Sequence, residues 1–101
     1  MVFSEIIERL EAEWDTGGFF DRVRNGDYDA MQAHNILKML CALCFNDNEL
    51  LPKRLVTLLW YLPSFLGWQV DRVAERGGDS VAYKQFITEI QNALEEILGT
   101  P

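Results

Sequence analysis

The sequence has few of the residues on which catalysis, membrane insertion and nucleic-acid binding depend. Only nine basic residues stand against sixteen acidic ones, which gives a net charge of -7 and a pI near 4.5. A protein that binds nucleic acid directly usually has the opposite sign of charge, so this balance argues against that class. No apolar run reaches the roughly 18 residues of a membrane span. The longest candidate, residues 55–66, is interrupted by Thr57, Pro63 and Ser64.

The beginning of the sequence also lacks the pattern of a secretory signal. Glu5, Glu8 and Glu11 stand where a signal peptide would have a basic start and an apolar stretch. The two cysteines, Cys41 and Cys44, are fewer and more closely spaced than those of small secreted domains. We therefore expect a cytoplasmic protein with reduced thiols and no membrane association.

Catalytic and metal-binding patterns are scarce as well. There is one histidine, no Ser/His/Asp spacing and no glycine-rich phosphate loop. Cys41 and Cys44 form a C-x-x-C pair seven residues after His34, but a zinc site needs a fourth ligand and a redox pair usually starts a helix. We expect both cysteines to be buried structural residues and His34 to be an ordinary polar residue. The sequence predicts no enzyme, no metal and no cofactor.

What the sequence has is an ordinary globular balance of residues. Among its 101 residues, 49% are hydrophobic and 25% are charged, so a single domain can form a core. Four segments show helical periodicity, at about 4–14, 30–45, 52–75 and 80–98, and the linking piece 19–28 has room for one more helical turn. The prediction is an all-α, single-domain bundle over residues 1–101. It has four to five helices, two of them nearly all apolar and central, and the third is kinked at Pro63.

The charge is distributed unevenly along the chain. Residues 1–30 contain eight acidic and three basic residues, so they hold -5 of the net charge of -7. One interpretation is that these acids maintain solubility and pair with helix dipoles. The other is that they form a surface that attracts a basic partner and speeds its capture.

Aromatic residues accompany the acids in this region, and aromatic anchors rimmed by charge are typical of binding hot spots. Arg22 and Arg24 are expected to be internal partners that hold their loop against Asp27 or Asp29. The predicted partner-binding residues are five carboxylates and two aromatic anchors: Glu11, Asp15, Asp21, Asp27, Asp29, Trp14 and Phe20.

Two other functions remain open at this point. The aromatic residues Trp60, Tyr61, Phe65 and Trp68 suit a self-associating adaptor or a subunit of a larger assembly. The run GGDSV at residues 77–81 is similar to the phosphopantetheine attachment motif of carrier proteins. In those domains about half the chain follows the serine, whereas here a single helix follows. A glycine turn and an aspartate that caps the next helix account for the same five residues.

Several stretches resemble small bacterial immunity proteins of polymorphic-toxin and contact-dependent inhibition systems. These are GGFFDRVRNGDYD at residues 17–29, LVTLLWYLPSF at 55–65, WQVDRV at 68–73 and EEILGTP at 95–101. The resemblance implies a cytosolic antidote that binds one cognate toxin domain, often a nuclease, and blocks it. A carboxylate-rich face suits that function, because a nuclease presents cations where phosphates bind.

Overall fold

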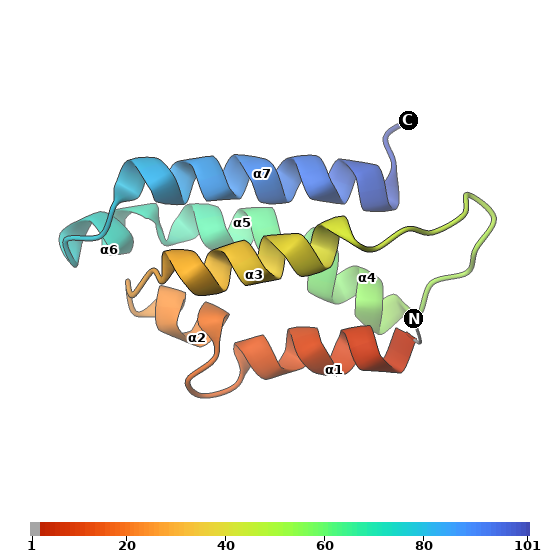
Figure 1. Ribbon diagram of the computed structural model, residues 1–101, viewed down its shortest axis with the longest axis horizontal. Coiled ribbons are helices and arrows are strands. Elements are labelled where there is room, and N and C mark those ends of the chain that lie inside the picture. The colour runs from red at the N-terminus through yellow and green to blue at the C-terminus, as the bar shows by residue number, and fades with distance from the viewer. Residues whose placement is uncertain (1–2) are drawn as a thin grey trace.

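The computed structural model describes residues 3–101, and its first helix matches the predicted one (Figure 1). Helix α1 spans Phe3–Trp14. Ile6 and Leu10, one helical turn apart, are its fully buried residues. The side of α1 away from them is acidic.

A tight turn connects α1 to the short helix α2, Phe19–Arg24. Gly17 has a φ of 85°, and a Cβ on Gly18 would lie 2.5 Å from the carbonyl oxygen of Glu13. The turn therefore requires glycine at both positions, for backbone conformation at the first and for close approach at the second. The linking piece thus contains a helix of six residues, whose apolar side chains all enter the core.

Helix α3 spans Ala30–Cys41 and ends four residues before the predicted position. Asp29 caps it by accepting hydrogen bonds from the N–H groups of Met31 and Gln32. Beyond the helix the chain turns so that Leu43 is buried, while Cys41 and Cys44 are exposed. The prediction that both cysteines are buried is wrong: Cys41 ends α3 on its exposed side, and Cys44 lies beyond the helix, which was predicted to continue to Phe45.

The predicted third helix consists of three short ones: α4, Lys53–Trp60; α5, Leu62–Trp68; and α6, Val70–Glu75. The breaks fall at Tyr61 and Gln69. Pro63 lies in the first turn of α5, where a missing N–H leaves no helical hydrogen bond unmade. This region is less buried than predicted: Trp60 is 57% exposed and Trp68 is 64% exposed.

The last helix, α7, spans Ser80–Leu98 and is the longest. Asp79 caps it by accepting a hydrogen bond from the N–H of Ala82, and Gly99, with a φ of 84°, follows its end. The side of α7 that faces the core is buried through Tyr83, Phe86, Ile90, Leu94 and Ile97, whereas Leu98, at the end of the helix, is exposed. The hydroxyl of Tyr83 donates a 2.7 Å hydrogen bond to the carbonyl oxygen of Leu66, which ties α7 to α5.

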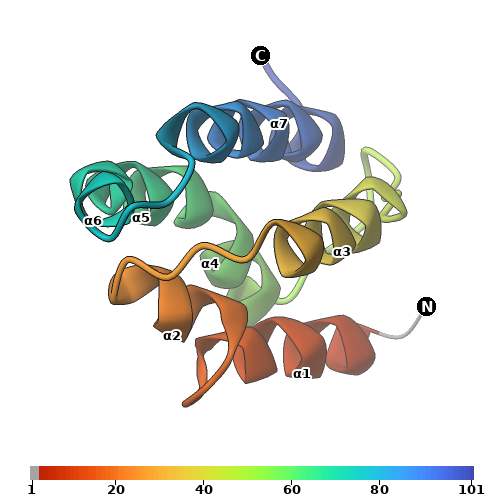
Figure 2. The same cartoon turned by 60° about the vertical axis from the view of Figure 1, so that its left-hand side comes forward.

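Two groups of helices share one core. Helix α7 packs on α3, α5 and α6, and α1 packs on α2 and α4 (Figure 2). Residues 3–101 contain no strand, so the predicted all-α bundle is confirmed. With α4, α5 and α6 counted as one broken helix, it has five helical units. None of the helices described is both long and apolar enough to cross a membrane.

Candidate protein-binding surface

The outward side of α1 carries the acidic edge, which we define as Glu5, Glu8, Glu11 and Asp15. The three glutamates recur at every third position, so they follow one side of the helix, and Asp15 comes directly after its end. Glu5, Glu8 and Asp15 are exposed and Glu11 is partly exposed. Four of the eight acids in residues 1–30 therefore lie along one side of α1 and at its end.

A largely apolar hollow lies beside this edge, between the end of α1 and α4. We call it the aromatic groove, and its volume is about 440 Å³. The exposed ring of Trp60 is part of its wall. Its lining consists of Trp14, Arg54, Thr57, Leu58, Trp60 and Tyr61.

An ion pair stands at the boundary between the acidic edge and the groove. Arg54 of α4 donates from Nε and from Nη2 to Oε2 of Glu11, at 3.0 and 2.8 Å. The side chains of Arg54 and Glu11 are 56% and 42% exposed. Glu11 is one helical turn before Trp14, so the carboxylate and the indole face the same side of α1.

Trp14 forms the inner wall of the groove and is the centre of an aromatic cluster. Its ring lies 4.7 Å from that of Phe20, 4.6 Å from Phe65 and 6.3 Å from Tyr61, measured between centroids. The guanidinium of Arg24 lies 5.9 Å from the Trp14 ring centroid, within the range of a cation–π contact. Within residues 3–101, no acceptor pairs with its buried Nε1–H.

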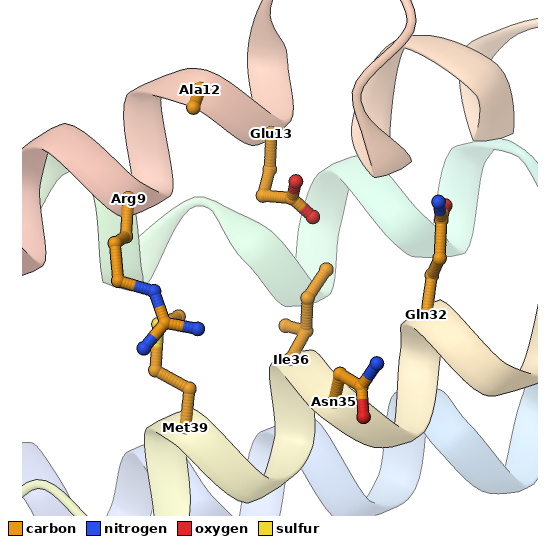
Figure 3. A pocket seen from close by; sticks show the side chains of 7 residues that line it. All are labelled: Arg9, Ala12, Glu13, Gln32, Asn35, Ile36 and Met39. Carbon is orange, nitrogen blue, oxygen red and sulfur yellow. The ribbon is translucent and has the colours of Figure 1, made fainter.

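A second hollow, of about 350 Å³, lies on the other side of α1, between α1 and α3. Figure 3 shows Arg9 and Glu13 reaching from α1 toward α3 and Gln32 reaching from α3 toward α1; Asn35 also lines the hollow. The apolar lining comes mainly from Ile36 and Met39 of α3. Acidic and basic groups are balanced there, so this hollow adds no net charge to the acidic edge.

The predicted carboxylates of the α2–α3 loop are bound within the chain. Arg22 donates from Nε to Asp27 at 2.8 Å, and from Nη1 to Gln32 at 3.0 Å and to Asp29 at 3.5 Å. The hydrogen bond to Asp27, followed by the charge of that carboxylate, raises the pKa of Arg22 above its ordinary value. The prediction that Arg22 holds this loop is confirmed.

Three other predictions for this region take a different form in the structure. In residues 3–101 Arg24 forms no ion pair; its guanidinium lies over the rings of Trp14 and Phe65. Asp21 accepts a hydrogen bond from the N–H of Gly17 at 3.0 Å. Phe20 is 0% exposed and belongs to the core, so it has no surface for a partner to contact.

The structure thus brings together three of the seven predicted site residues. Glu11, Trp14 and Asp15 lie at the same end of α1, next to the groove, whereas the other four serve the turns around α2 or the core. Sequence reasoning missed Arg54. Its signal was weak, because nothing in the order of residues indicates that α4 packs on α1.

In the part of the chain described, no group of three or more potential ligands could hold a metal ion. The surface described above consists of the carboxylates of the acidic edge, the rings of the aromatic groove and the ion pair between them. In comparisons with known proteins, no family model, curated protein or solved structure matches the chain.

Proposed function

We propose that this protein is a cytoplasmic immunity protein that binds a basic bacterial toxin domain and neutralises it by covering its active surface. The observation that supports this most is the position of the acidic edge beside the aromatic groove. The sequence resemblance to immunity proteins points in the same direction.

The two parts of the surface suit different stages of association. Carboxylates on the acidic edge attract a basic partner from a distance and raise the rate of encounter. Rings that are partly buried, such as Trp14, or exposed, such as Trp60, supply the short-range contacts that dominate binding energy at interfaces. Rapid capture is valuable here because each free toxin molecule acts many times.

Inhibition follows from the same charges if the toxin is a nuclease. Such an enzyme must present cations where the phosphates of its substrate bind. An inhibitor whose carboxylates occupy those cations excludes the substrate electrostatically and by bulk, without needing catalytic groups of its own.

The direct test is co-expression with the product of the neighbouring upstream gene. We expect that product to be toxic alone and harmless together with this protein. The triple variant E5Q/E8Q/D15N removes three exposed charges from the acidic edge, and we expect it to slow association about tenfold and to weaken rescue. The control, E75Q/E95Q/E96Q, removes three exposed charges from α6 and α7. A harmless upstream product, or equal rescue by both triple variants, would contradict the proposal.

A second candidate function, self-association in a larger assembly, has an observation of its own. The rings of Trp60 and Trp68 are exposed, and each lies 5.7 Å from the ring of Tyr61 between them. Exposed aromatic clusters of this kind often mark interfaces. Sedimentation velocity separates the two functions: a stable homodimer that W68A disrupts favours assembly, and a monomer at all concentrations excludes it.

A further inference from the structure

We infer that the aromatic groove receives an arginine side chain of the partner, which replaces Arg54 as the cation bound to Glu11. This inference deepens the proposed function, because it rests on the partner being a basic protein. It specifies the chemical group that docks and the residues that receive it. Three features of the structure support it.

The first feature is the Glu11–Arg54 pair itself. Glu11 already binds a guanidinium through two N–H groups, so its position and geometry suit an incoming arginine. Both side chains are about half exposed, and ion pairs with that exposure contribute little to stability. Exchange of one arginine for another at Glu11 therefore costs little.

The second feature is that Trp14, one of the rings that line the groove, already has a guanidinium close to it. Arg24 places its guanidinium 5.9 Å from the Trp14 centroid and 5.8 Å from the Phe65 centroid. An arginine in the groove would meet the same indole together with Trp60 and Tyr61. Aromatic faces attract cations, and arginine also stacks on them through its planar head, which lysine lacks.

The third feature is the charge around the opening. The acidic edge, with four carboxylates, lies along one side, and the other side is formed by residues of α4 and Tyr61. The charged residues of α4 are the two cations Lys53 and Arg54, so carboxylates predominate around the opening. An acidic occupant would be repelled by the edge. A purely apolar occupant would gain nothing from Glu11, whereas an arginine uses the carboxylate with its head and the apolar wall with its methylene stem.

The test uses a short probe, the capped peptide Ac-Gly-Leu-Arg-Leu-Gly-NH2, and a matched peptide with citrulline, which is neutral and nearly isosteric, in place of arginine. The signals of the three tryptophan indole N–H groups, followed by NMR during titration, report where each peptide binds. We expect the arginine peptide to shift the signals of Trp14 and Trp60 but not that of Trp68. The citrulline peptide should bind at least about tenfold more weakly.

Two variants test the exchange. R54A removes the side chain that competes for Glu11 and should tighten binding of the arginine peptide several-fold. The control is K84A, which removes an equal charge from the exposed face of α7 and should have a smaller effect. E11Q removes the receiving carboxylate and should weaken binding about tenfold, while E95Q, on α7, should change it little. Circular dichroism checks that each variant keeps its helices.

The inference is overturned if R54A behaves like K84A, if citrulline binds as well as arginine, or if only Trp68 responds. A homodimer that buries Trp60 in solution would overturn it too, because the groove would then hold a second copy. Its failure is distinct from that of the proposed function. If E5Q/E8Q/D15N no longer rescues cells and the arginine peptide does not bind, only the inference about the groove is refuted. If the upstream product is harmless, the proposed function is refuted, but binding of the peptide still tests the groove.

Discussion

Replacement of Tyr83 by phenylalanine tests the packing of α7 on α5 through the pH dependence of stability. Tyr83 is 0% exposed, and its hydroxyl donates to the carbonyl oxygen of Leu66 at 2.7 Å. Burial, reinforced by the charge of the neighbouring Tyr28, raises the pKa of Tyr83 well above its ordinary value of 10.0. The folded protein therefore keeps this proton at a pH at which the unfolded chain has lost it.

The size of the effect follows from two terms. Loss of one neutral hydrogen bond lowers the stability by about 1 kcal/mol. The cost is no larger because the Leu66 carbonyl oxygen still accepts a hydrogen bond from the N–H of Gln69, at 3.1 Å, and so is not left unpaired in Y83F. At pH 11 an unfolded tyrosine with a pKa near 10 is about nine-tenths ionised, which stabilises the unfolded wild type by about 1.4 kcal/mol. That second term is absent from Y83F. The free energy of unfolding of the wild type should therefore exceed that of Y83F by about 1 kcal/mol at pH 8. At pH 11 it should be about 0.4 kcal/mol smaller than that of Y83F.

The sign is fixed by linkage. A raised tyrosine pKa contributes stability that is complete below pH 10 and declines as the pH rises above it, by about 1.4 kcal/mol per pH unit. Urea unfolding of both proteins at pH 8, 10 and 11 measures the difference, and alkaline effects common to both chains, including that of Tyr28, cancel. If the difference in free energy of unfolding between the two proteins stays the same from pH 8 to pH 11, the conclusion that Tyr83 is buried and neutral would be refuted.

Three further predictions concern the backbone, the thiols and a helix cap. G26A and G77A both place alanine at a positive φ, but a Cβ at Gly26 would come within 2.6 Å of α6 whereas Gly77 faces open space. Urea unfolding should show that G77A lowers the stability by about 1–2 kcal/mol and that G26A lowers it by at least about 1 kcal/mol more. Equal losses would contradict the close approach of Gly26 to α6. Ellman's reagent should titrate Cys41 and Cys44 in the folded protein, and thiols that react only after unfolding would contradict their exposure. D29A should lose about 1 kcal/mol and D29N much less, since the amide oxygen also caps α3; equal losses would argue against the cap.

Much of the fold could be predicted because periodicity and capping are local. The apolar spacing of α1 and α7, the aspartate before α7 and the glycine after it are all visible in the chain. The end of α3 could not be predicted in this way. Apolar residues continue to Phe45, and only tertiary packing decides that Leu43 turns inward while Cys41 and Cys44 face solvent.

The candidate site was less predictable, because it depends on which helices meet. Acidic residues near the beginning of the chain indicated a charged surface, but Arg54 reaches Glu11 across 43 positions of sequence. The groove exists only because α4 packs on α1 and its break at Tyr61 leaves Trp60 on the surface. No pattern within either segment specifies that pairing.

The structure also changes what the acidic count means. Asp21, Asp27 and Asp29 accept hydrogen bonds inside the chain, so a partner would have to break those bonds before using these carboxylates, and the net gain would be small. Glu5, Glu8 and Asp15 have no side-chain partner among residues 3–101, so their effect on a basic partner would be long-range attraction, which salt screens. Association with a basic partner should therefore slow as salt increases, while the short-range contacts in the groove keep the dissociation rate nearly constant.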